Sequence, residues 1–172
     1  MRTREQPKMQ VAFRIHASID QDAAERVRQK KPVTGRLCLQ LGQLRYPSKT
    51  WNGFVAAVLG SLAHTLCLLK DEIIEVHTHF MDGPYELYCR RQVGSRMLSL
   101  MCVTNDRPVM TAPCHVDRRR YAAEISNAVD EVLGQLRERG ASQSPEARGL
   151  RKMVSEMRKQ EERRRREGWL GW

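Results

Sequence analysis

The strongest constraint on the fold is a change in the spacing of apolar residues near residue 50. Before it, in residues 10–19 and again in residues 36–41, apolar side chains alternate with polar ones, as in a half-buried strand. After it they recur at the spacing of an amphipathic helix, for which Ser48 or Thr50 is placed as N-cap. The helical stripe consists of Trp51, Phe54, Val55, Val58, Leu59, Leu62, Leu66 and Leu69. A stripe this broad predicts one helix lying across a sheet.

The alternation returns after this helix. The segments with strand character are "EIIEVHTHF", "YELYCRR", "RMLSLMCV" and "PVMTAPCHV". The first three are joined by "MDGPY" and "QVGS", short sequences that are typical of turns. We therefore expect an antiparallel meander.

Two further helices follow the strands. Residues 117–139 carry apolar side chains at helical spacing, and Gly140 is suited to end that helix. After the linker "ASQSPEA", a last helix from about Pro145 to Arg166 has a narrow apolar stripe. The predicted fold class is α+β, an antiparallel meander sheet with amphipathic helices packed on one face, plus a C-terminal helical extension.

This order of elements predicts a core domain and a tail. The core domain covers residues 1–140, with residues 1–9 flexible and residues 20–32 forming a polar connection. Residues 141–172 form the linker and a basic C-terminal helix and tail.

Composition limits the compartment and the partners. No apolar run is long enough to span a bilayer, so we expect a cytoplasmic protein. The cysteines are widely spaced in apolar segments, which favours reduced core residues over a disulfide framework. They are Cys38, Cys67, Cys89, Cys102 and Cys114. The net charge of +10, concentrated toward the ends of the chain, favours an acidic partner.

The strand in residues 72–80 carries the first candidate site. Its alternation places Glu75, His77 and His79 on the face opposite the apolar residues. With Tyr88 of the next strand they form a candidate partner-binding surface. Two histidines on one face could also ligate a metal, but a third ligand would have to come from elsewhere, from Cys38, Glu86 or His115. We therefore predict no metal and no cofactor.

Signs of catalysis are weak. Asp82 lies in an Asp-Gly-Pro turn, and aspartate is common in turns for conformational reasons. Glu75 and Glu86 could pair as acid and base, but glutamates are common on exposed faces. There is no GxSxG elbow and no glycine-rich phosphate loop. We therefore predict that the protein is not an enzyme.

The C-terminal helix carries the second candidate site. Its apolar stripe is too narrow for a helix that is stable alone, so it must dock on this domain, a second copy or a partner, and we expect a partner protein. The stripe consists of Leu150, Met153, Val154 and Met157. The residues beyond it form an alternative, nucleic-acid-binding site, because arginines contact phosphates and tryptophan stacks on bases. They are Arg163, Arg164, Arg165, Arg166 and Trp169.

The segments "GRLCLQLGQLRYPSKTWNGFVAAVLGSLAHTL", "FMDGPYEL" and "VLGQLRERG" together resemble small α+β immunity proteins of bacterial toxin loci. The resemblance covers residues 35–140. The matching positions are Pro47, Trp51, Phe80, Asp82, Gly83, Pro84 and Tyr85. It implies a protein that binds and neutralises a partner toxin without catalysis of its own.

The sequence thus supports three hypotheses, in decreasing order. The first is a protein-binding module, an immunity protein or an accessory subunit of a bacterial toxin or defence system. The second is a nucleic-acid-binding component that uses the arginine-rich tail. The third is a small enzyme or metal protein centred on His77 and His79.

Overall fold

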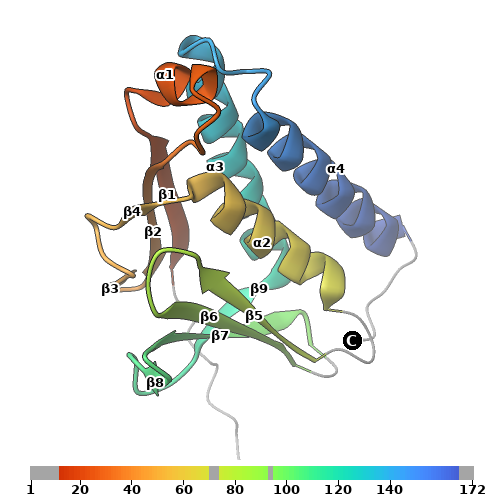
Figure 1. The fold of residues 1–172 in the computed structure, drawn as a ribbon. Helices are drawn as coiled ribbons and strands as arrows, with labels where there is room; N and C mark the ends of the chain where they lie inside the picture. The colour runs from red at the N-terminus through yellow and green to blue at the C-terminus, as the bar shows by residue number, and fades with distance from the viewer. Residues whose placement is uncertain (1–11, 70–73, 93–94, 167–172) are drawn as a thin grey trace, which may run out of the picture.

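The strands form two antiparallel sheets, with the helices gathered on one side of them (Figure 1). The structure is a computed structural model, which describes residues 12–69, 74–92 and 95–166. The predicted α+β class with a C-terminal helix is confirmed. The strands do not form one continuous sheet, however, because the helix-containing segment between them separates an N-terminal sheet from a central one. Residues 1–9, which were expected to be flexible, lie outside the described residues.

The N-terminal sheet has four strands. Strands β1 (Phe13–Ile19), β2 (Gly35–Leu41) and β3 (Leu44–Tyr46) pair in that order, and β4 (Asn52–Gly53) pairs with the start of β2. In β1 the buried and more exposed residues alternate, as their spacing predicts. Gly42, with φ of 63°, lies in the tight turn between β2 and β3, where a left-handed conformation suits glycine.

The central sheet has five strands. Strands β5 (Glu75–Phe80), β6 (Tyr85–Arg91), β7 (Met97–Thr104) and β8 (Arg107–Pro108) follow one another, and β9 (Cys114–Asp117) pairs with the start of β7. The segment expected as one last strand is thus divided into β8 and β9. Thr78, Phe80, Leu87 and Leu100 belong to the buried face of this sheet.

Four helices complete the described chain: α1 (Ala23–Arg28), α2 (Val55–Leu68), α3 (Arg118–Glu138) and α4 (Pro145–Arg166). Helices α2 and α3 lie against the sheets, and α4 lies on their far side, away from the strands (Figure 1). Asp117 caps α3, since its carboxylate accepts hydrogen bonds from the backbone N–H groups of Arg119 and Arg120. The short helix α1 lies in the polar connection of residues 20–32, for which no helix was predicted.

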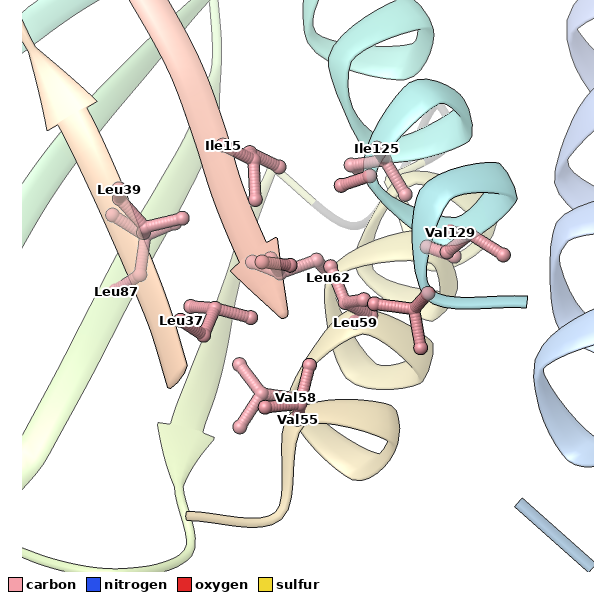
Figure 2. Packing of buried hydrophobic residues seen from close by; sticks show 14 of the residues in the cluster. Ile15, Leu37, Leu39, Val55, Val58, Leu59, Leu62, Leu87, Ile125 and Val129 are labelled. Atoms are coloured by element: carbon pink, nitrogen blue, oxygen red, sulfur yellow. The ribbon is translucent and has the colours of Figure 1, made fainter. Parts of the chain in front are cut away.

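One hydrophobic core joins both sheets to the helices. Figure 2 shows aliphatic side chains of α2 between the two sheets and α3. The residues labelled there are Ile15, Leu37, Leu39, Val55, Val58, Leu59, Leu62, Leu87, Ile125 and Val129. The same cluster continues into Ala147, Leu150, Val154 and Met157 of α4. The division predicted at residue 140 therefore does not coincide with a break in the core.

The two sheets are joined at the start of α2. The Tyr46 hydroxyl at the end of β3 accepts a hydrogen bond from the backbone N–H of Glu86 at 2.8 Å and donates to the carbonyl group of Val103. The Trp51 indole donates to the carbonyl oxygen of Asp82 at 3.2 Å and meets the ring of Phe80 edge to face. These contacts hold the edge of the N-terminal sheet against the turn between β5 and β6.

Helix α2 begins later than the sequence predicts. The expected caps Ser48 and Thr50 lie before β4, and the N-cap residue is Phe54, whose backbone N–H donates to the carboxylate of Asp82 at 3.1 Å. The pairing of β4 with β2 takes precedence over the local helical pattern at Trp51. A side chain on Gly53 would reach within 2.4 Å of the Asp82 carboxylate, so glycine is required where this cap approaches.

Truncating side chains at the start of α2 and within it should lower the free energy of unfolding by different amounts. Leu62 is fully buried, whereas Phe54 is only half-buried at the end of the helix. We expect Leu62→Ala to lower the free energy of unfolding by about 2–5 kcal/mol. Phe54→Ala should cost less, although it removes the larger side chain. Urea denaturation of both variants measures the two values, and a larger loss for Phe54→Ala would contradict this packing.

Candidate functional site

The apolar stripe of α4 is occupied within the chain. Leu150, Val154 and Met157 are only 1–3% exposed, and Met153 is partly buried beside them. They pack in the core that α4 shares with α2 and α3. The prediction that this stripe binds a partner protein is therefore corrected. The stripe docks on its own domain, the first of the three surfaces that a helix of this kind could use.

A buried ionic cluster fastens the far end of α4. Arg118, the first residue of α3, has a side chain only 5% exposed and donates to Glu161 of α4 at 2.8 Å. It also donates to the backbone carbonyl of Leu66 at 2.6 Å, near the end of α2. Arg164 of α4 pairs with the same Glu161 at 3.2 Å and donates to the carbonyl of Leu69 at 3.1 Å. The two guanidinium groups thus satisfy carbonyl groups that the end of a helix leaves unpaired.

The remaining tail arginines have different surroundings. Arg164 is a structural residue, so the expected run of four phosphate-binding arginines is interrupted. Arg163, Arg165 and Arg166 are exposed, and Arg166 pairs with Glu162 at 2.5 Å. Trp169 lies outside the described residues.

The outer face of the central sheet brings the other candidate residues together. Glu75, His77 and His79 are exposed on β5, on the face opposite the core, as their alternation predicts. The strand register places His77 opposite Tyr88 and His79 opposite Glu86. Among the described residues, no helix covers this face.

The side chains on this face hold one another in place. The rings of His77 and Tyr88 stack with centroids 3.7 Å apart and planes 2° apart. The His77 Nε2 atom lies 3.1 Å from a carboxylate oxygen of Glu75, and His79 Nδ1 lies 3.4 Å from Glu86. Partial desolvation and the charge of Glu86 raise the pKa of Tyr88. The result is a flat aromatic platform between polar pairs.

The structure offers no metal centre at these histidines. In the described part of the chain, no group of three or more histidine, cysteine, aspartate or glutamate side chains is arranged to hold an ion. Of the third ligands considered, Cys38 is buried in the N-terminal sheet, and Glu86 lies 3.4 Å from Nδ1 of His79. His115 is on β9.

A serine and a histidine do meet on the central sheet. Ser99 Oγ lies 3.1 Å from His115 Nδ1, and the amide nitrogen of Gln92 lies 3.0 Å from both atoms. Because an amide nitrogen only donates, Nδ1 acts as an acceptor and the imidazole proton is on Nε2. A ring nitrogen already engaged by an amide is a poor base for activating the Ser99 hydroxyl. We therefore interpret this triplet as a link between β7, β9 and Gln92, the residue that follows β6.

The cysteines have the character of core residues. All five are free and buried, as predicted. Burial raises the pKa of Cys89 to about 12, that of Cys102 to about 12 and that of Cys114 to about 11. Thiols with such values are protonated at neutral pH and are weak nucleophiles.

Five of the seven positions named for the resemblance have structural tasks. Asp82 caps α2, Trp51 and Phe80 form the joint between the sheets, and Tyr85 meets Tyr46 edge to face. Gly83, with φ of 135°, allows the turn.

No family model matches this sequence, and neither a curated protein nor a solved structure matches it. Within the described residues, no helix is long and apolar enough to cross a membrane.

Sequence reasoning missed Arg118, Arg119 and Arg120. One signal was available, because these three cations form the first turn of α3, which contains no acidic residue. Cations near a helix N-terminus oppose the helix dipole, so their presence there requires another reason. For Arg118 that reason is the contact with Glu161 and the end of α2.

Neighbouring glutamates on α4 offer a matched test of the buried cluster. Glu161→Ala removes the carboxylate that Arg118 and Arg164 share and leaves a buried guanidinium without it. We expect a loss of about 3 kcal/mol in the free energy of unfolding. Glu162→Ala removes only the surface partner of Arg166 and should cost less than about 1 kcal/mol. Equal losses in urea denaturation would show that the cluster does not hold α4.

Because of Cys89, the free energy of unfolding should fall as pH rises through the alkaline range. Burial raises the pKa of Cys89 from 9.0 in the unfolded chain to about 12 in the folded protein. Above pH 9 the unfolded chain loses the thiol proton while the folded protein keeps it. The stability that the buried thiol contributes is therefore full below pH 9 and is lost as pH rises toward 12. Serine does not titrate in this range. The difference in unfolding free energy between wild type and Cys89→Ser should therefore narrow by roughly 1.4 kcal/mol per pH unit above pH 9. A constant difference across that range would contradict the burial of this thiol.

Proposed function

We propose that this protein is a non-catalytic binding module whose outer central-sheet face contacts a partner protein. One observation carries the proposal: the row across the middle of that face contains His77, Tyr88 and Met101. Tyrosine and methionine are enriched at protein interfaces. The stacked rings are already ordered, so little conformational entropy is lost when a partner covers them.

The neighbouring rows supply a polar rim. On one side Glu75 lies opposite Arg90, and on the other His79 lies opposite Glu86. An aromatic centre surrounded by polar residues is the arrangement in which a few central side chains supply most of the binding energy. This pattern favours a specific interface over a solvated sheet surface.

The outer face of the N-terminal sheet differs in composition. Its exposed positions include Arg14, His16, Arg36 and Arg45, with His16 Nε2 lying 3.0 Å from the side-chain oxygen of Gln40. Desolvating several charged side chains is costly, and none of these residues is a tyrosine, tryptophan or phenylalanine. It is therefore the weaker candidate and a suitable internal control.

The nature of the partner follows from charge and from the resemblance. A net charge of +10 favours an acidic protein. The resemblance to small immunity proteins suggests a toxin or a subunit of a bacterial toxin or defence complex as that partner. The free, buried cysteines support a reducing compartment, and we place the protein in the cytoplasm on that ground.

Single substitutions on the two sheet faces test the proposal. Tagged full-length wild type, Tyr88→Ala and His16→Ala would be used to capture partners from the native host, and the captured protein would then be purified for calorimetry. We expect His16→Ala to bind like wild type and Tyr88→Ala to weaken binding about 30-fold or more. If Tyr88→Ala binds as tightly as wild type, the interface is elsewhere.

A further inference from the structure

The antiparallel contact between α3 and α4 brings together exposed arginines from two distant parts of the sequence. Arg158 of α4 donates to Asp130 at 2.6 Å and to Ser126 at 3.3 Å, both on α3. Seven residues make about two helical turns. Two turns before Ser126 the α3 stripe reaches Arg119, and two turns after Arg158 the α4 stripe reaches Arg165. These two arginines therefore lie on facing stripes at the same end of the helix pair.

Further cations border this pair. Arg120 is exposed beside Arg119, and Arg163 and Arg166 are exposed in the last turn of α4. Arg96 reaches the start of α3, where it lies 3.7 Å from the carboxylate of Asp117. Three carboxylates of this end that the structure describes are already engaged: Asp117 caps α3, Glu161 holds Arg118 and Arg164, and Glu162 pairs with Arg166. Arginines outnumber the described carboxylates here, so the described surface is positive. We call it the arginine end; it consists of Arg96, Arg119, Arg120, Arg163, Arg165 and Arg166.

Fold stability does not account for Arg119 and Arg120. Arginines in the last turn of α4 are favourable for that helix, because the dipole there attracts cations. Arg119 and Arg120 are at the opposite, unfavourable end of α3. Neither makes an ion pair with a described residue, and the register of the two helices puts a further cation, Arg165, at the same end as Arg119. An anion bound at this end would offset the unfavourable interaction with the dipole of α3.

We infer that the arginine end binds the phosphate backbone of a nucleic acid. All of its cations are arginines, whose planar guanidinium groups make paired hydrogen bonds to phosphate oxygens. The arginines are spread over two helix ends and the turn before β7, so they suit a repeating polyanion better than one isolated anion. This surface is separate from the aromatic face of the central sheet, so its function is independent of the proposed protein interface.

The test compares two triple variants that lose the same charge. The patch variant is Arg119→Ser, Arg120→Ser and Arg165→Ser. The control variant is Arg14→Ser, Arg36→Ser and Arg45→Ser, on the outer face of the N-terminal sheet. Fluorescence anisotropy with labelled single-stranded RNA, single-stranded DNA and duplex DNA measures the affinity of each full-length protein from low to moderate salt.

We expect wild type and the control variant to bind at least one of these nucleic acids with similar affinity. The patch variant should bind on the order of tenfold or more weakly, and its salt dependence should fall by about 0.7–0.9 in slope for each phosphate group that it no longer neutralises. Because Arg119 and Arg120 oppose the dipole of α3, the patch variant should also melt no lower than wild type. Tyr88→Ala should retain nucleic-acid binding, which keeps this test distinct from that of the sheet face.

Three results would overturn the inference. One is an absence of binding by wild type at low salt. Another is an equal loss in both triple variants, which would mean that only the net charge matters. The third is binding of polyglutamate at the arginine end as tight as that of the nucleic acids, which would assign this surface to an acidic protein.

Discussion

The arrangement of the helices depends on one buried guanidinium group. Arg118 begins α3, reaches the last carbonyl groups of α2 and pairs with Glu161 of α4, so a single side chain contacts three helices. A buried arginine is tolerated only when its charge and its donors are satisfied. Helix α4 supplies the carboxylate, and Arg164 on the same helix completes the cap of α2. Helix α4 is consequently part of the fold, and only some of its arginines are exposed enough to contact another molecule.

A second joint determines which sheet surface remains open. Asp82 caps α2, while Tyr46 and Trp51 fasten the N-terminal sheet to the central one. These contacts turn the inner faces of both sheets toward the helices and leave the outer faces to solvent. Trp51, Phe80 and Asp82 are therefore explained by folding. The surfaces proposed for binding are the row around Tyr88 and the arginine end.

Local patterns predicted the elements but not their partners. The bounds of α4 and the buried face of β5 follow from spacing alone, and both agree with the structure. The start of α2 was predicted too early, because the pairing of β4 with β2 overrides the helical pattern at Trp51. The stripe at Leu150 indicated an apolar face but could not indicate what covers it. The role of Arg118 was likewise hidden, since it depends on carbonyl groups some 50 residues away in the chain.

Hydrogen exchange of the α4 amides tests most directly whether this helix belongs to the core. If it does, amides near Leu150, Val154 and Met157 should exchange only through global unfolding. Their opening free energy and denaturant dependence should then equal those of amides near Leu62 in α2. Exchange of the α4 amides at a much lower free energy, with little dependence on denaturant, would show that the helix detaches while the rest of the fold stays intact, and would contradict the account given for Arg118 and Glu161.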